Sequence, residues 1–416
     1  MGTTFVALLV LRLAVAISAV PYTLQTNLSG PTFFDAFDFW TQYDPTYAQP
    51  KAGLLYENRA DQVTSFGFVE YIDRGAAQAL QMLHVTDGVA YFGADAVQMY
   101  DPYANKGRKS LRLSTKQTFN HGLFIIDLSH MPSSVCGIWP AIWMLGNGPL
   151  PWPAYGELDI IEYTNDASHG LFAMHTAPNC TIAGSGQTGT LLTNDCGEDQ
   201  GYKGCNISPN MPNTFFPRTA VIPPAVLALN PNPDEFGTPV ANFGGSCNID
   251  EHFSNMQLIF NIDFCGTWAG PTFNSNTSCP VMDPSNQWTS CNIYVGNNPQ
   301  AFKEAYFAVN SILVHQSATA NVPESSSVPS VVPAESTRSV SASGAEGRPT
   351  TSSTSNTPTA GSAVPSDTAA NQSSSISTPS PTLLGDTSPV GASTEIVVET
   401  STVIVTVAPP PRPSLA

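Results

Sequence analysis

Three carboxylates lie within one short stretch of this sequence, at Glu157, Asp159 and Glu162. Large aliphatic residues separate them, and Tyr155 and Tyr163 flank the stretch, a composition that favours a β-strand. In a regular strand the side chains alternate between two faces, so Glu157 and Asp159 share one face. Glu162 lies an odd number of residues after Glu157 and would point to the opposite face.

The adjacent pair Ile160 and Ile161 interrupts this alternation. A β-bulge at the pair adds one residue to the strand and returns Glu162 to the face of the other two acids. Three carboxylates on one face repel each other, and protonation of one of them relieves that repulsion. The stretch therefore predicts a bulged strand that carries anionic and protonated carboxyl groups side by side.

Two carboxyl groups, one anionic and one protonated, are the machinery of glycoside hydrolysis. Their close spacing on one strand favours the retaining geometry, with carboxyl groups about 5–5.5 Å apart. Two alternatives are a solvated strand face with scattered acids and a calcium or magnesium site built from carboxylate oxygens. No Asp/Asn/Gly loop of the kind that calcium needs surrounds the stretch, so we expect no metal and no organic cofactor.

The stretch Glu157–Glu162 resembles the catalytic signature of family 16 glycoside hydrolases, the laminarinase and lichenase group. Four further blocks are similar, in order, to fungal endo-β-1,3(4)-glucanases of this family, namely Gly137–Trp143, Met174–Thr176, Phe264–Gly270 and Tyr294–Pro299. The resemblance covers residues 32–316. It implies that Glu157 is the nucleophile, that Glu162 is the general acid and then the base, and that Asp159 raises the pKa of Glu162.

The candidate substrate contacts come from the similar blocks and from two positions outside them. Aromatic rings pack well against the apolar faces of sugars, and the resemblance places Trp143 in the wall of the cleft, while Trp139 is expected in packing. Further candidates are Trp152 in a Pro-Trp-Pro loop and Trp268. The resemblance also implies that His175 lies beside the acid/base and that an arginine donates to sugar hydroxyls, for which we choose Arg108 over the nearby Arg112.

Short segments between Gly and Asp turns, with almost no helical periodicity, argue for an all-β sandwich. Ser110–Ser114 alternates cleanly, and Leu123–Leu128 is a continuous apolar run of the kind buried on both faces. Aromatic residues in Thr32–Tyr43 are expected to fill the core from one strand. The resemblance makes the fold specific: a β-jelly roll of the concanavalin A-like type with a concave substrate cleft.

The composition indicates a secreted protein that handles neutral polymers. The formal net charge is −17, with only 15 Lys and Arg, which argues against a nucleic-acid ligand. Residues 1–19 have the apolar run of a signal peptide. Eight cysteines between Cys136 and Cys291 indicate disulfides, although the pairing stays open among 105 possibilities. Glycosylation sequons begin at Asn27, Asn179, Asn206, Asn276 and Asn371.

Composition divides the chain into a catalytic domain over residues 20–316 and a tail over residues 317–416. The tail is rich in Ser, Thr and Pro and has no aromatic residue or cysteine, so we expect it to be disordered and dispensable for catalysis. Its apolar run at Thr402–Ala408 is too short for a membrane span. We expect a monomer without stable membrane insertion, secreted and in some contexts bound to a cell wall.

One region departs from the resemblance. Relatives have two strands between the cysteine-rich loop and a block like Thr214–Arg218, but here that block follows Cys205 closely. We therefore expect an open sheet edge that Val221–Leu229 fills only in part, and a loss of stability and activity. Two other functions remain open: a transglycosylase that remodels cell-wall glucan, and an inactive glucan-binding wall protein.

Overall fold

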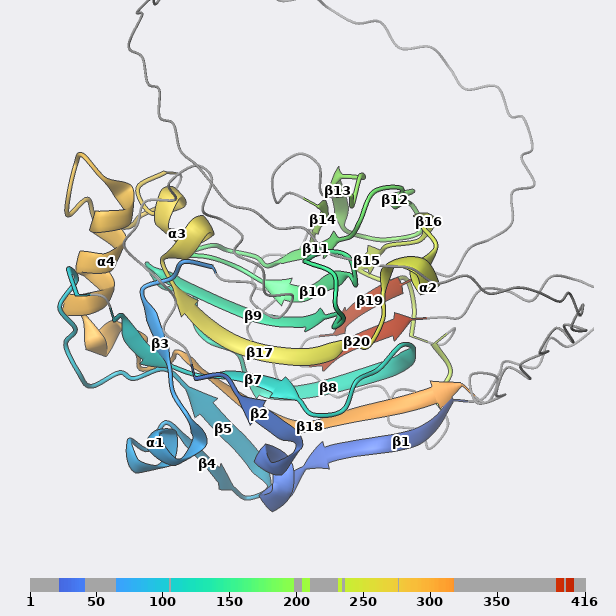
Figure 1. The fold of residues 1–416 in the computed structure, drawn as a ribbon, viewed down its shortest axis with the longest axis horizontal. Coiled ribbons are helices and arrows are strands. Elements are labelled where there is room, and N and C mark those ends of the chain that lie inside the picture. The colour runs from blue at the N-terminus through green and yellow to red at the C-terminus, as the bar shows by residue number, and fades with distance from the viewer. Residues whose placement is uncertain are drawn as a thin grey trace, which may run out of the picture. The chain divides into compact units, whose positions relative to one another are not determined.

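The protein is built mainly from β-strands, as the sequence predicts. The computed structural model describes residues 22–41, 65–104, 106–197, 204–209, 231–233, 236–275, 277–317, 394–399 and 402–407. In this part of the chain, two 8-stranded sheets, here called sheets A and B, account for most strands (Figure 1). The predicted signal peptide, Val221–Leu229 and the connection from residue 318 to residue 393 lie outside the described residues.

Sheet B carries the three acids at its centre. Its pairings are antiparallel, and each acid has a neighbouring strand on either side. The spatial order of its strands is β13 (Thr190–Thr193), β14 (Cys205–Ser208), β11 (Leu171–His175), β10 (Glu157–Glu162), β9 (Ile138–Leu145), β17 (Gln257–Phe264), β7 (Arg112–Thr115) and β2 (Phe37–Phe39).

Sheet A is also antiparallel and combines segments from both ends of the chain. Its order is β15 (Ala241–Asn242), β19 (Thr394–Glu399), β20 (Thr402–Val407), β8 (Gly122–His130), β18 (Tyr306–Ser317), β5 (Val89–Gly93) and β4 (Leu83–Thr86), with β1 (Tyr22–Ser29) also paired to β18. Two small sheets join β3 (Val69–Tyr71) to β6 (Arg108–Ser110) and β12 (Thr181–Ile182) to β16 (Gly245–Ser246).

The described helices are short and lie outside the two sheets (Figure 1). They are η1 (Gly30–Ala36), α1 (Arg74–Ala79), α2 (Ile249–His252), α3 (Gly266–Thr272), α4 (Gln287–Asn297) and η3 (Pro299–Phe302). The first of these corrects an expectation, because the aromatic segment at the start of the domain begins as a 3₁₀ helix with Pro31 in its first turn and becomes a strand only at Phe37. Its Phe33 and Phe34 are nevertheless buried, as predicted.

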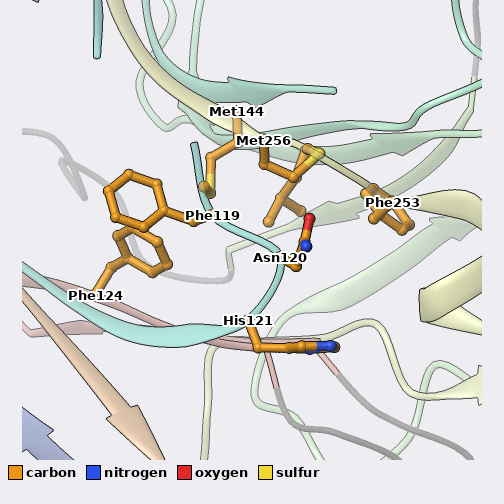
Figure 2. Close-up of a pocket in the computed structure, with 8 residues that line it drawn as sticks. Phe119, Asn120, His121, Phe124, Met144, Phe253 and Met256 are labelled. Atoms are coloured by element: carbon orange, nitrogen blue, oxygen red, sulfur yellow. The ribbon is translucent and has the colours of Figure 1, made fainter. Parts of the chain in front are cut away.

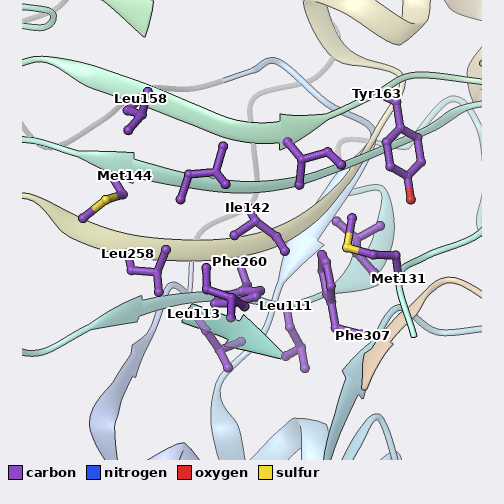
Figure 3. Packing of buried hydrophobic residues seen from close by; sticks show 14 of the residues in the cluster. Leu111, Leu113, Met131, Ile142, Met144, Leu158, Tyr163, Leu258, Phe260 and Phe307 are labelled. Atoms are coloured by element: carbon purple, nitrogen blue, oxygen red, sulfur yellow. The ribbon is translucent and has the colours of Figure 1, made fainter. Parts of the chain in front are cut away.

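The main core is formed by side chains of both sheets (Figure 3). Met144, Leu158 and Leu258 come from sheet B, and Phe307 comes from sheet A. Phe260 has its ring centroid 5.5 Å from that of Phe307, in an edge-to-face arrangement. Aromatic contacts therefore connect the two layers at β17 and β18.

Strand β8 is buried on both faces, which confirms the prediction from its apolar run. Phe124 and Ile126 belong to the main core. Leu123 and Ile125 belong to a second buried cluster that also contains Phe236. Such a strand is suited to the interior of a sheet, and here it pairs with β18 on one side and with β20 on the other.

The eight cysteines form four disulfides, which confirms the expectation from their even number. The pairs that the sequence left open are Cys136–Cys279, Cys180–Cys247, Cys196–Cys205 and Cys265–Cys291. Two of them tie the helical region around α3 and α4 to the sheet, and the other two hold the loops beyond β11. Among the described helices, none has the length and apolar character that a membrane span requires.

Two strands lie within the predicted tail, residues 317–416, namely β19 at Thr394–Glu399 and β20 at Thr402–Val407. Strands β19 and β20 form an antiparallel hairpin, and β20 pairs with β8 in sheet A (Figure 1). The hairpin sequence is rich in Ile and Val, which favour strands.

The interlayer core gives a first prediction. Replacing Phe260 with alanine should lower the free energy of unfolding by about 3–5 kcal/mol, because it leaves a cavity where four aromatic rings meet. Urea denaturation measures this loss. Met99→Ala is the control, since Met99 is 66% exposed and its loss should change stability by less than about 0.5 kcal/mol. Equal midpoints for the two variants would contradict the described packing.

Candidate active site

The predicted β-bulge is present in β10. Asp159 pairs with Trp143 of β9, and Ile161 pairs with the next residue of β9, Ile142, so β10 contains one extra residue between these pairs. The pairing with β11 shifts at the same place. Because two bulky isoleucines occupy the bulge and both are buried in the main core, the strand keeps its apolar side inward on both sides of the irregularity.

The bulge brings the three acids to one face of sheet B. The β9 partners of Glu157, Asp159 and Glu162 are Leu145, Trp143 and Ala141, which lie two residues apart and therefore share a face. These three partners form a small cluster separate from the main core. We call this side of sheet B the acid face. The sequence prediction that Glu162 rejoins the other two acids is confirmed.

Each glutamate on the acid face accepts a hydrogen bond from a tryptophan indole. Trp152 Nε1 donates to Glu157 Oε2 at 3.0 Å, and Trp139 Nε1 donates to Glu162 Oε2 at 2.9 Å. Trp152 was predicted at the site, whereas Trp139 was expected only in packing. The two donors come from different elements, a loop before β10 and the strand β9. Neither segment alone shows that each glutamate has one indole donor.

The loop that carries Trp152 is fixed at its junction with β10. Gly156 has φ +79° and precedes Glu157 directly. A Cβ at this glycine would lie 2.4 Å from the ring of Phe253, so only glycine fits. The backbone N–H of Gly156 donates to the carbonyl of Pro153 at 2.9 Å, which folds the loop back over the start of the strand. This turn holds the indole next to Glu157.

Asp159 and His175 form a pair between the two glutamates. His175 Nε2 lies 3.4 Å from Asp159 Oδ2, and both side chains are largely buried. His175 is the register partner of Glu157 on β11, and the ring of Trp152 lies 5.6 Å from the imidazole. His175 therefore lies on the acid face, where its register partner is Glu157, whereas the sequence had placed it beside Glu162.

Trp143 also lies on the acid face and is held in place by polar and cationic neighbours. Its Nε1 donates to Asn261 Oδ1 at 2.6 Å. The guanidinium of Arg112 lies 4.8 Å from the Trp143 ring and 4.8 Å from that of Trp40. Arg112 and Asn261 were not selected from the sequence. They come from β7 and β17, far from β10 in the chain, and no local pattern marks them.

Arg108 is not part of this site, which corrects the choice made from the sequence. Its side chain is fully buried and donates to the backbone carbonyls of Val295, Asp95 and Gln98. The rings of Tyr100 and Phe302 lie about it, at 5.0 and 4.9 Å from the guanidinium carbon. A guanidinium enclosed in this way joins the segment Asp95–Gln98 to α4. The arginine on the acid face is Arg112.

Trp268 reaches the site through its contact with Trp139. The two rings are perpendicular, with centroids 5.6 Å apart. Trp268 lies in α3, which follows Cys265 directly, and the Cys265–Cys291 disulfide joins this position to α4. Because Trp139 is the donor to Glu162, the Trp268 ring stands one side chain away from that carboxyl group.

Burial raises the pKa of both glutamates, and the negative charge of Asp159 adds to the effect. The pKa of Glu157 rises to about 8, and that of Glu162 rises well above its ordinary value. A carboxylate removed from water is costly unless protonated or bound by donors. The acid face therefore retains protons to a higher pH than isolated glutamates do.

Opposing effects distinguish the two glutamates. The charge of His175, the Trp152 N–H and the charge of Arg112 all lower the pKa of Glu157, because each stabilises its anion. The pKa of Glu162 is lowered by an indole N–H and by His175, but the charge of Glu157 raises it. These differences favour the anion at Glu157 and the proton at Glu162.

Glu157, Asp159 and His175 also satisfy a geometric requirement for a metal site, since their candidate ligand atoms all lie within 4.8 Å of one another. Two carboxylates and one imidazole form a ligand set that several divalent ions accept. The same three groups have other partners here, since Glu157 accepts from Trp152 and Asp159 pairs with His175. The three groups therefore already contact other side chains of the acid face.

A separate apolar pocket lies on the other side of β9 and β10 (Figure 2). Its lining residues are Phe119, Asn120, His121, Phe124, Met144, Leu158, Phe253 and Met256. Met144 and Leu158 alternate with the acid-face residues and belong to the main core. The pocket therefore lies beneath β10 and contains none of the three acids.

A family model described as the XgeA-like, catalytic GH16 domain matches residues 55–215 and 210–315. A probable endo-1,3(4)-β-glucanase of Aspergillus niger is 35% identical over 328 residues, which is 73% of this chain and 41% of the relative. The endo-1,3(4)-β-glucanase xgeA of Emericella nidulans is 32% identical over 328 residues, 73% of this chain and 48% of the relative. The chain thus spans less than half the length of these two relatives.

Two solved structures are similar over most of the described domain. An elongating family 16 β-1,3-glucosyltransferase has a TM-score of 0.62 and 35% identity, covering 71% of this chain and 100% of that one. Laminarinase 16A from Phanerochaete chrysosporium, solved with 6-O-glucosyl-laminaritriose in donor and acceptor sites, has a TM-score of 0.59, 30% identity and the same coverage. These similarities confirm the predicted β-jelly-roll sandwich.

The raised pKa of Glu157 predicts how stability depends on pH. The folded protein binds this proton more tightly than the unfolded chain, so the resulting stability is complete below the ordinary pKa of 4.5 and is lost as pH rises to about 8. Glu157→Gln cannot ionise, and should therefore melt several degrees above the wild type at pH 8.5 but close to it at pH 4.

Thermal unfolding at the two pH values tests this, with Glu251→Gln as the control because Glu251 is exposed. The control should follow the wild type at both pH values. If Glu157→Gln shows no extra stability at pH 8.5, burial of this carboxyl group does not raise its pKa.

Proposed function

Because the chain belongs to glycoside hydrolase family 16, we propose that it is a secreted, retaining endo-β-glucanase that hydrolyses β-1,3 or mixed β-1,3/1,4 glucans. One observation carries the proposal. Glu157 and Glu162 share a face of one bulged strand, and each is bound by its own indole N–H. Relatives named as endo-1,3(4)-β-glucanases support the choice of substrate class.

In the first step, the anion of Glu157 attacks the anomeric carbon of a bound glucan while Glu162 donates its proton to the departing glycosidic oxygen. The donors around Glu157 favour this assignment because they stabilise its anion. A transition state with oxocarbenium character adds positive charge next to Glu157, which favours the same ionised form. The product is a glycosyl ester on Glu157 and a released chain end.

In the second step, Glu162 acts as the base. It removes a proton from water, and the oxygen attacks the anomeric carbon and releases Glu157 as a carboxylate. Asp159 raises the pKa of both glutamates, so it supports the proton-carrying role of Glu162. His175 contacts the Asp159 carboxylate through Nε2 and orients it.

The aromatic residues of the acid face supply the surface for sugar rings. Trp143, Trp152 and Trp268 present flat apolar rings around the two glutamates, and sugars offer matching apolar faces. Arg112 is placed between Trp40 and Trp143 and takes the role that the sequence analysis gave to Arg108, donating to hydroxyl groups.

Four disulfides and the sequons support secretion, because both belong to oxidising, extracellular compartments. We propose a monomer that meets its polysaccharide outside the cell, in solution or in the wall. The sheet face that would meet the polymer is built from acids and aromatic rings, without the basic cluster that nucleic acid requires.

A transglycosylase is the second candidate. In that case a sugar hydroxyl replaces water in the second step, and Glu162 removes its proton in the same way. The similarity to an elongating β-1,3-glucosyltransferase favours this alternative. A defined laminarin oligosaccharide separates the two, since a transglycosylase forms products longer than its substrate and a hydrolase forms only shorter ones.

The principal experiment is incubation of the purified full chain with laminarin and with lichenan, followed by measurement of new reducing ends. A glucanase releases them from at least one polymer, and Glu157→Gln abolishes the release. Binding to either polymer without any new reducing ends or longer products would support an inactive glucan-binding wall protein instead.

The roles of the two glutamates give a further prediction. Glu157→Ala should lower kcat on an activated aryl glucoside by several orders of magnitude, because it removes the nucleophile. Azide should restore part of the rate and yield a product of inverted configuration. Glu162→Ala should also respond to azide, but with retained configuration. The opposite pattern of configurations would exchange the two assignments.

The indole donors predict a separation of the two limbs of the pH profile. Trp152→Phe removes the donor to Glu157, so its pKa rises and the acidic limb of kcat/KM should move to higher pH by about one unit. Trp139→Phe removes the donor to Glu162, so the alkaline limb should move to higher pH. The two variants serve as controls for each other. A shift of the same limb in both variants is incompatible with the assigned roles.

A further inference from the structure

The structure gives β8 the character of an interior strand. Residues on both of its faces are buried, with Phe124 and Ile126 in the main core and Leu123 and Ile125 in the second cluster. Its backbone is paired along one side with β18. A strand of this length with apolar residues on both faces is a poor sheet edge, because its open side would offer unpaired N–H and C=O groups to other chains.

The second side of β8 is paired only by the C-terminal hairpin among the described residues. Every residue of β20, from Thr402 to Val407, has a register partner on β8, from Asp127 to Gly122. Strand β19 continues the sheet outward and pairs with Ala241 and Asn242 of β15. The hairpin therefore fills the whole interval between β8 and β15.

The hairpin lies next to β15, the strand that follows the section where the sequence predicts missing strands. The sequence analysis expected two strands to be missing after Cys205, before the segment that leads to β15. The two stretches that match the family model meet at residues 210–215, in the same region. The strand that follows this region, β15, is separated from β8 in the sheet by two strands from the far end of the chain.

We propose that the hairpin β19–β20 is a strand donor in cis that replaces two missing strands and completes sheet A, with residues 318–393 as its tether. The tether joins the end of β18 to the start of β19, and both lie at the same end of sheet A. There Thr394 of β19 pairs with Val407 of β20, and Val407 pairs with Gly122 of β8. The next residue of β8, Leu123, pairs with His315 of β18. Three strand spacings separate β18 from β19, roughly 15 Å at the usual spacing.

The length of the tether does not oppose this arrangement. The entropy lost on closing a loop grows only slowly with the number of residues in it, so a long connection is tolerated. A hairpin rich in Ile and Val that stayed outside a sheet would also be prone to aggregate. Pairing with β8 satisfies the backbone of both partners.

The hairpin also stabilises the packing behind the acids, because β8 contributes to that packing. Phe124 of β8 lines the apolar pocket together with Met144 of β9 and Leu158 of β10 (Figure 2). Leu158 lies between Glu157 and Asp159 in the strand. Loss of the hairpin would leave β8 paired on one side only, and would loosen the packing beneath the catalytic strand.

Two deletions of the full chain test the proposal. Truncation after Gln316 removes the tether and the hairpin, and should lower Tm by ten degrees or more. Deletion of residues 330–380 removes part of the tether and keeps the hairpin, and should leave Tm within two degrees of the full chain. A synthetic peptide of residues 392–409 should raise the Tm of the truncated protein in proportion to the logarithm of its concentration. Equal Tm values for truncated and full chains would overturn the proposal.

Cross-linking in the full chain provides a test that does not depend on the truncated protein folding. Ile125 and Ile404 are register partners, so Ile125→Cys with Ile404→Cys should form a disulfide within one chain. The control pairs Ile125→Cys with Thr394→Cys, a residue of β19, which β20 separates from β8, and should not cross-link. A cross-linked dimer would show that the hairpin comes from a second copy, and absence of any cross-link would show that it does not pair with β8; either result overturns the proposal.

Discussion

A single extra residue in β10 determines which side chains meet on the acid face. On either side of the bulge, the strand alternates regularly between core and surface. The bulge lets Ile160 and Ile161 both remain in the core, and it moves Glu162 into line with Glu157 and Asp159. Without it, Glu162 would point into an apolar layer, where a carboxyl group has no compensating partner. The register shifts against both neighbouring strands, so the irregularity belongs to the whole centre of sheet B.

The three acids are tolerated in a largely buried place because each has a compensating group. An indole N–H binds each glutamate, and an imidazole lies against Asp159. Arg112 contributes positive charge on the side of Glu157. These groups do not offset the whole cost of burying three negative charges, so the pKa values of the two glutamates rise and protonation removes the remaining charge. The same balance of burial and compensating groups favours the anion at Glu157 over the anion at Glu162.

The two sheets draw their strands from different parts of the chain. Sheet B is made from segments that lie between Phe37 and Phe264, and its centre is built from β9, β10 and β11 in succession. Sheet A joins strands from the two ends of the described chain, with β1 and β20 on opposite sides of the β8–β18 pair. Phe260 of sheet B and Phe307 of sheet A are in contact between the layers, so correct strand pairing in sheet A helps to hold sheet B in place. The arrangement of the acid face therefore depends on strands that carry none of its residues.

The sequence by itself determined the features that follow from short-range alternation and composition. The bulge at Ile160–Ile161, the shared face of the acids, the burial of β8 and the presence of disulfides were all predicted from neighbouring residues. These features depend on the period of two in a strand, which is visible in a few consecutive positions. The resemblance to a known family added the sandwich fold, which the structural comparisons support.

Only the tertiary structure decided which distant residues meet. It placed Arg112 rather than Arg108 on the acid face, made Trp139 a donor to Glu162, and paired the eight cysteines. It also brought the hairpin at Thr394–Val407 to β8, where the composition of the tail had indicated no structure. Each of these contacts joins residues on separate elements, so its energy depends on the register and stacking of whole sheets. No local pattern encodes that register, because it is set only when all the strands have paired and the layers have packed.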